Sequence, residues 1–167
     1  LPESVRRRRA IIAGDNLCVV WWNQGAWKPS FEQYAIARWV NMMTLQSAFN
    51  DNLLQPPAMW MDFFAHIFRE HNEAADALAK AACQAGVIVG TTWTSIRNGD
   101  MPLLVTFDGS YNEQAAGAAA VLWASHSQSS PAGPCELFCE GMRWRQMYCI
   151  GVRVQAVSAT YSEMAAS

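Results

Sequence analysis

The stretch FREHNEAADALAKAA, from Phe68 to Ala82, decides how the rest of the chain is interpreted. Asn72 is a favourable helix N-cap, and Glu73 follows in the first turn, where the helix dipole favours an acid. Asp76 lies about one turn into this helix and is expected to face the edge of the surface on which the helix packs. Taken alone, Asp76 is equally consistent with a stray surface acid. Apolar residues at helical spacing complete the pattern: Ala75, Leu78, Ala79 and Ala82.

The composition indicates one folded domain. The chain has 167 residues, of which 51% are hydrophobic, and this is enough for one sizeable core. It contains no apolar run of membrane-spanning length and no visible signal peptide, so no membrane partner is expected. Five cysteines without paired metal-ligand spacing favour reduced thiols in an intracellular protein. The net charge of −2 argues mildly against strong non-specific binding of nucleic acid, unless several acids belong to one metal site.

Hydrophobic periodicity predicts strands that alternate with helices. A capping box at Ser30 and Gln33 is expected to open the second helix, with Phe31, Ala35, Met42, Leu45 and Phe49 facing inward. Two stretches, 136–141 and 147–155, are both candidates for a third strand after the hairpin. Strands are expected at 10–14, 59–68, 103–107 and 116–124, with a short one at 87–93, and helices are expected after Asn16, Ser30, Asn72 and Ser158.

The sequences of four segments resemble the ribonuclease H family, especially the domains attached to reverse transcriptases. Arg-Glu-x-Asn-x-x-Ala-Asp-x-Leu-Ala, from Arg69, is similar to the junction between the family's last strand and last helix. Val105-Thr-Phe-Asp-Gly-Ser110 resembles the opening strand, and Gly14-Asp-Asn-Leu17 resembles the fourth strand and the following helix. Ser162-Glu-Met-Ala-Ala166 resembles the start of the first helix. The resemblance implies an α/β ribonuclease H-like fold, with a five-stranded mixed sheet flanked by helices.

The order of these segments differs from that of the family, and this predicts a circular permutation. Residues 1–83 correspond to the family's C-terminal half and residues 102–167 to its N-terminal half, with 84–101 as a linker inside a single domain. A permuted chain would be a complete monomer. Alternatively, the two halves come from neighbouring domains of a tandem array or polyprotein, and they pair between chains in an exchanged dimer.

The resemblance also implies a set of catalytic and metal-binding acids: Asp108, Glu163, Asp15 and Asp76. Such acids hold two Mg²⁺ ions, for which Mn²⁺ can substitute. The implied reaction is endonucleolytic cleavage of the RNA strand of an RNA/DNA hybrid, which leaves 5′-phosphate ends. Four acids this close would repel one another without metal, so a purely structural role for all of them is not favoured.

Several further residues are candidates for substrate contacts. Gly109 permits a close backbone approach, and either Arg69 or His71 takes the place of a mobile histidine that aids product release in the family. Two other functions stay open: a catalytically silent module that binds hybrids, and another polynucleotidyl transferase of the same fold. The candidate substrate-binding residues are Gly109, Ser110, Asn112, Asn16 and Thr160.

Overall fold

The structure is a computed structural model that describes residues 9–28, 31–51, 54–57, 59–91, 103–112, 115–126, 136–139 and 142–154. Strands and helices are mixed along the chain, which confirms the α/β class. No helix of these ranges is both long enough and apolar enough to span a membrane. The elements are β1 (Ala10–Gly14), α1 (Leu17–Gln24), α2 (Glu32–Asn50), η2 (Trp60–Phe63), β2 (Phe64–His66), η3 (Arg69–His71), α3 (Glu73–Ala85), β3 (Val87–Thr91), β4 (Leu103–Tyr111), β5 (Ala116–His126), β6 (Glu136–Cys139) and β7 (Met142–Val154), where η denotes a short 3-10 helix.

One mixed sheet carries all the described strands. Its order is β2-β1-β4-β5-β7-β3, and β6 also pairs with β7. β1 is parallel to both β2 and β4, whereas β4, β5 and β7 form an antiparallel meander. The predicted count of five strands is therefore wrong, because the described residues form seven. The extra two are β6 and β3, and β3 lies within the stretch interpreted as a linker and pairs with β7.

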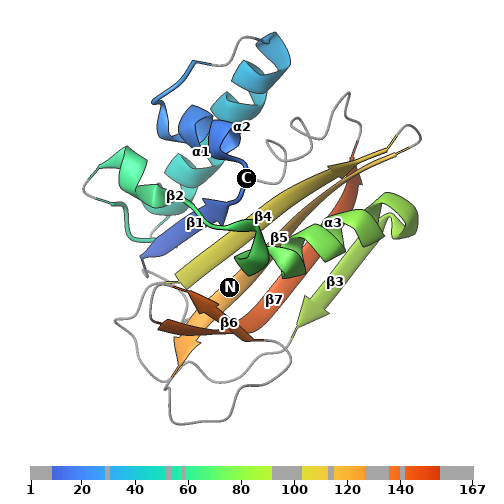
Figure 1. Cartoon of the computed structure of the whole chain (residues 1–167). Coiled ribbons are helices and arrows are strands. Elements are labelled where there is room, and N and C mark those ends of the chain that lie inside the picture. Colours follow the sequence, from blue (N-terminus) through green and yellow to red (C-terminus); the bar gives the residue numbers. More distant parts are fainter. Residues whose placement is uncertain are drawn as a thin grey trace.

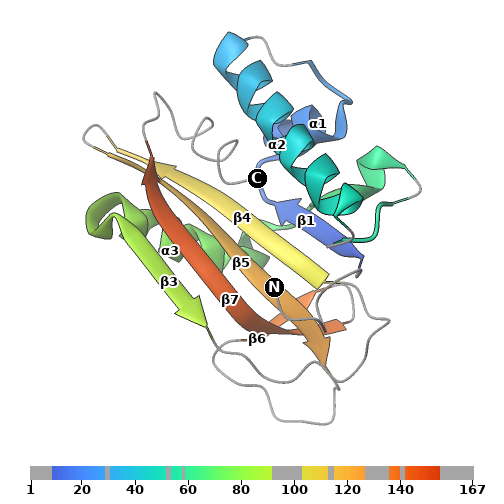
Figure 2. The same cartoon turned by 180° about the vertical axis from the view of Figure 1, so that it is seen from behind.

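Helices cover the two faces of the sheet unequally. α3 lies across β4, β5 and β7 on one face, whereas α1 and α2 lie on the opposite face beside β1 (Figures 1 and 2). Each face has its own buried cluster. Ala75 of α3 packs with Leu104 and Trp123 on the first face, and Val19 of α1 packs with Phe63 on the second. Because helices cover both faces of the sheet, β1 and β4 are buried on both sides, and their sequences are nearly continuous apolar runs.

The close contact between α3 and the sheet depends on glycine. A Cβ atom at Gly117 of β5 would clash with the backbone carbonyl of Ala79 and approach the amide of Cys83. A Cβ atom at Gly151 of β7 would lie 3.0 Å from the Leu78 side chain. Because these neighbours belong to α3, the missing side chains set the distance of the helix from the sheet.

We expect Gly117→Ala to lower the free energy of unfolding by about 1–3 kcal/mol, because the added methyl meets rigid helix backbone rather than a flexible side chain. Urea denaturation followed by tryptophan fluorescence measures this change. Ala81→Leu adds bulk to an exposed position of α3 and should change the stability by less than about 0.5 kcal/mol. Equal stability of the Gly117→Ala protein and the unmodified protein would contradict the proposed close contact.

The apolar run 59–68 is not the single strand that its sequence predicts. Residues 60–63 form the 3-10 helix η2, and only Phe64–His66 pair with β1. The Trp60 indole donates a hydrogen bond of 2.8 Å to the carbonyl of Asn23, and its ring stacks on that of Phe63. A covered indole N–H needs such a partner, and the tight turn brings Trp60 within reach of this carbonyl in α1.

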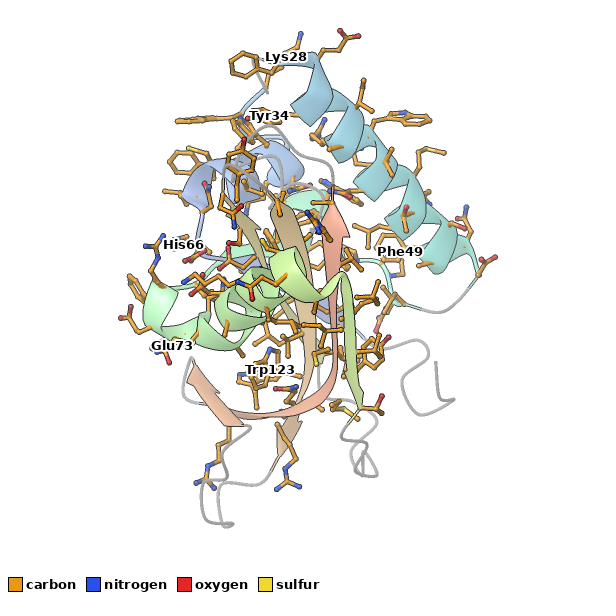
Figure 3. The ribbon with its side chains drawn as sticks, turned by 90° about the vertical axis from the view of Figure 1, so that its right-hand side faces the viewer. Lys28, Tyr34, Phe49, His66, Glu73 and Trp123 are labelled. Atoms are coloured by element: carbon orange, nitrogen blue, oxygen red, sulfur yellow. The ribbon has the colours of Figure 1, made fainter. Side chains whose placement is uncertain are left out.

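The second helix begins later than predicted, and its inward face differs. α2 starts at Glu32 with Phe31 as the N-cap residue, and the side chain of Phe31 makes no capping hydrogen bond. Phe31 is 63% exposed and Ala35 is also exposed, so both are wrongly assigned to the core. Leu45 and Phe49 do pack inward, and Phe49 meets Phe63 edge-on at 5.5 Å. Figure 3 labels Phe49 near the C-terminal end of α2. Ser30, the first residue of the expected capping box, lies outside the described residues.

Candidate active site

Asp15 and Asp108 come from neighbouring parallel strands. β1 and β4 are in register from Ala10 opposite Leu103 to Ala13 opposite Thr106. Continuing this register by two residues brings Asp15 level with Asp108. Asp15 follows the carboxyl end of β1, whereas Asp108 lies within β4 and is only 5% exposed. The sheet itself therefore sets the two carboxylates side by side.

Asp76 reaches the same place from α3. Side chains alternate along a strand, so Asp108 points to the face of β4 that also carries Leu104 and Thr106. This is the face that α3 covers, and Asp76 lies in the first turn of α3. The charges of Asp15 and Asp76 both act on Asp108, which shows that the three carboxylates share one region. Figure 3 shows the surroundings: His66 at the end of β2 and Glu73 at the start of α3 lie on the same side of the molecule.

The side chain of Asn72 connects separate segments of this region by hydrogen bonds. Its side-chain amide donates to the carbonyl of Phe107 at 3.0 Å and to Asp15 Oδ1 at 3.4 Å. Asn72 occupies the N-cap position of α3, but its side chain makes no capping hydrogen bond, so the predicted capping role is wrong. The residue is 1% exposed, and its own Oδ1 has no hydrogen-bond partner among the described residues. One buried amide thus links the start of α3 to the end of β1 and to the middle of β4.

Two cations of the chain accompany the acids. Arg69 Nε donates to Asp15 Oδ2 at 3.1 Å, and Lys80 Nζ donates to Asp76 Oδ2 at 2.6 Å. The hydrogen bond to Asp15 and the charge of Asp15 raise the pKa of Arg69, and the corresponding interactions with Asp76 raise the pKa of Lys80. The negative charge of Asp108 also raises the pKa of both basic groups. The charges of Asp15 and Asp76 are therefore each partly neutralised by one basic side chain.

Asp108 has no such direct cation partner among the described contacts. Burial raises the pKa of its carboxyl to about 7, and the negative charge of Asp15 contributes next, followed by that of Asp76. The backbone N–H of Gly109, which donates to Asp108 Oδ1 at 2.8 Å, opposes this rise, and so does the more distant Arg69. The buried centre of the site is thus short of positive charge.

The polar residues that are predicted to contact the substrate, near β4 and α1, also have structural roles. The Asn16 side chain caps α1 by accepting from the amides of Cys18 and Val19. Asn112 lies at the turn between β4 and β5, where its side chain accepts from the amide of Ala115 at 2.8 Å. The carbonyl of Ser110 accepts from Cys83 Sγ. Their predicted contacts with substrate stay predictions.

Two of the predicted site residues, Glu163 and Thr160, lie outside the described residues. Arg69 and His71 both belong to η3, directly before α3. Only Arg69 of this pair bonds an acid of the site, whereas His71 packs against the ring of Phe68. Among the described contacts, Arg69 is therefore the one of these two residues that bonds an acid of the site, and the product-release role of either residue stays a prediction.

The donor atoms suit a hard divalent cation. Within the described ranges, no three Asp, Glu, His or Cys side chains are already arranged as ligands of one metal ion. However, Asp15, Asp76 and Asp108 offer only carboxylate oxygens, the ligand type that Mg²⁺ prefers. Burial, and then the negative charges of Asp15 and Asp76, raise the pKa of Asp108, and a cation at this position would favour its charged form. The residues present therefore fit such an ion.

Three features of the site were missed at the level of sequence. The sequence pattern predicts a cap at Asn72, whereas its amide bridges the end of β1 and the middle of β4. Lys80 lies four residues after Asp76, a spacing at which ion pairs form on a helix, and this signal was available. His66 lies at the end of β2, in line with its predicted place in a strand, but its Nε2 lies 3.2 Å from the carbonyl oxygen of Asp15, a contact that the sequence does not indicate. No model of a known protein family, no curated protein and no solved structure matches this chain.

Proposed function

We propose that this chain is a metal-dependent nuclease of the ribonuclease H type, which hydrolyses the RNA strand of RNA/DNA hybrids. The observation that carries the proposal is the convergence of three aspartates from three separate segments: Asp15, Asp76 and Asp108. A buried carboxylate with a pKa of about 7 beside two further acids is costly to a fold and is typical of functional sites. The motifs around all three acids resemble that family.

The sheet arrangement supports the proposed permutation. The segment that resembles the family's opening strand is β4, and the segment that resembles its fourth strand is β1. These two are adjacent and parallel, although β4 follows β1 by most of the chain length. The connection from α3 back to β4 passes through β3, which adds a strand at the far edge of the sheet next to β7. A changed chain order is therefore compatible with direct contact between the acid-bearing strands.

Each residue of the site has a definite part in the proposed mechanism. Asp108 lies at the centre and accepts the Gly109 N–H, so one of its oxygens is fixed in direction. Asn72 orients Asp15 by donating a hydrogen bond to its Oδ1. The position of Asp76 is set by the packing of α3 on the sheet. When bound, two magnesium ions would activate the attacking water and stabilise the leaving oxygen. Glu163 is proposed as the fourth acid on the resemblance alone.

The substrate is expected to approach along the carboxyl end of β1 and the Gly109 segment of β4. Gly109 has no side chain, which allows a phosphate of the RNA strand to come close to Asp108. Asn16 and Asn112 remain candidates for contacts with 2′-hydroxyl groups, which distinguish RNA from DNA.

The direct test is cleavage of an end-labelled RNA/DNA hybrid by the monomer fraction from gel filtration, with Mg²⁺, with Mn²⁺ and with EDTA. We expect cleavage of the RNA strand only when metal is present, with 5′-phosphate products. Cleavage of plain DNA instead would favour another polynucleotidyl transferase. Binding of the hybrid without turnover would favour the silent binding module, and activity confined to a dimer fraction would favour exchange between chains.

Substitution of single acids tests the assignment of the site. Asp15→Asn and Asp76→Asn should each lower the cleavage rate by about 100-fold or more, because each removes charged oxygens that hold a cation in the transition state. Asp62→Asn makes the same change at an exposed acid of η2 and should leave the rate within about two-fold. Circular dichroism of every variant confirms that the fold persists. Full activity of either site variant would exclude its residue from the site.

A further inference from the structure

The ion pair between Arg69 and Asp15 has an unusual distribution of exposure. The Arg69 side chain is 89% exposed, whereas the Asp15 side chain is only 8% exposed. The guanidinium thus lies at the surface and bonds, through Nε, a carboxylate that is otherwise covered. Ion pairs of exposed cations contribute little to the stability of a protein, so the position of Arg69 indicates a role other than stabilisation.

Arg69 acts on the whole acidic site rather than on one partner. The hydrogen bond to Asp15 and the charge of Asp15 raise the pKa of Arg69 most, and the charges of Asp108 and Asp76 add to this rise. Lys80 differs, because its bond with Asp76 lies within one helix at a spacing of four residues. Arg69 instead joins η3 to the end of β1, and it covers the oxygen of Asp15 that Asn72 leaves available.

These contacts place a cation of the chain where a divalent ion would bind. Asp15 Oδ1 accepts from Asn72, and Asp15 Oδ2 accepts from Arg69. An ion bound at Oδ2 brings a second positive charge to the oxygen that the guanidinium contacts, so the two cations compete for it. Once released, the exposed guanidinium remains on the rim of the same site, and its planar set of donors matches a phosphate.

We propose that Arg69 is a displaceable counter-cation: it neutralises Asp15 before metal binds, and it transfers to a phosphate of the substrate when metal takes its place. This inference deepens the proposed nuclease function and rests on it for the identity of the substrate. The competition with metal is a property of the chain alone. Arg69 thereby couples the binding of metal to the binding of nucleic acid.

The first experiment measures Mn²⁺ binding without nucleic acid, from the electron paramagnetic resonance signal of the free ion. Arg69→Gln should bind Mn²⁺ roughly five-fold more tightly than the unmodified protein, because the competing charge is gone. Arg69→Lys keeps the charge and should stay close to the unmodified protein. Arg9→Gln removes an exposed arginine at the opposite end of β1, roughly 20 Å from Asp15, and should have no effect. Unchanged or weaker Mn²⁺ binding by Arg69→Gln would overturn the proposal.

The second experiment measures the affinity for a fluorescent RNA/DNA hybrid by anisotropy, in EDTA and in Mn²⁺, on proteins that also carry Asp76→Asn to slow turnover. Mn²⁺ should strengthen binding more when Arg69 is present than when it is replaced by Gln. The slope of log affinity against log salt in Mn²⁺ should fall by about 0.9 with Arg69→Gln, as expected for one lost phosphate contact. An equal gain from Mn²⁺ in both proteins would overturn the transfer to phosphate. Because the first experiment contains no nucleic acid, a wrong nuclease assignment would leave its result intact.

Discussion

Asp108→Asn should abolish cleavage and at the same time make the metal-free protein more stable at pH 8. The pKa of this buried carboxyl is raised from 3.8 to about 7 in the folded chain. Between these values the folded state holds a proton that the unfolded state has lost, so stability falls as the pH rises from about 4 to 7. The loss amounts to at most about 4 kcal/mol above pH 7, at 1.36 kcal/mol for each pKa unit.

Asparagine removes this penalty because it carries no charge, and it retains an oxygen that can accept the Gly109 N–H. We expect a rise in Tm of roughly 5–10 °C at pH 8 in EDTA, and little difference at pH 4. The cleavage rate should fall by about a thousand-fold or more, since several kcal/mol of transition-state stabilisation are lost.

Thermal unfolding at both pH values, together with the hybrid assay, measures these effects. Asp62→Asn is the matched control and should change neither quantity appreciably. A lower Tm for Asp108→Asn at pH 8 would show that the carboxylate contributes to stability rather than reducing it.

Asn72→Asp should be the most destabilising isosteric change in the site. It places a fourth carboxyl at a position that is 1% exposed, beside Asp15 and close to Asp108. It also replaces the amide that donates to the carbonyl of Phe107 and to Asp15 Oδ1. At neutral pH a charged carboxylate would face two acceptors, so we expect a loss of about 3–5 kcal/mol in the free energy of unfolding.

The sign of the pH dependence tests this explanation. The introduced carboxyl would have a raised pKa in the folded chain, so the loss should grow as the pH rises above about 4. Urea denaturation at pH 5 and pH 8 measures the difference between the two conditions. Asn112→Asp, at an exposed turn where the side chain acts as an acceptor, is the control and should lose less than about 0.5 kcal/mol. A loss that does not depend on pH would point to altered packing instead of charge.

Much of the framework was predictable, because its signals are local. The strands around Ile12, Val105 and Val121 and the helix after Asn72 follow from hydrophobic periodicity, and the structure confirms them. The α/β class and the mixed sheet are confirmed as well. The meeting of Asp15, Asp76 and Asp108 was expected from the resemblance, and the register of β1 on β4 supplies its physical basis.

The remaining features depend on contacts between distant residues. Residues 59–68 have the composition of a buried strand, but the hydrogen bond from Trp60 to Asn23 favours a 3-10 turn. Asn72 has the composition of a cap, and only the three-dimensional structure places the carbonyl of Phe107 within reach of its amide. The pairing of β3 with β7 likewise depends on where α3 ends, since Gly86 turns the chain with a positive φ.

The parallel pairing of β1 with β4 has a consequence for the speed and order of folding. Ala10 pairs with Leu103, so this contact closes a loop of about ninety residues, whereas β4 and β5 meet through a short turn. Loop closure over such a distance is slow, and we expect the β4–β5 hairpin to form before β1 joins it. Asp15 and Asp108 then meet only in this late step. The mutual repulsion of the carboxylates would therefore oppose the final closure of the sheet and leave the early stages of folding unaffected.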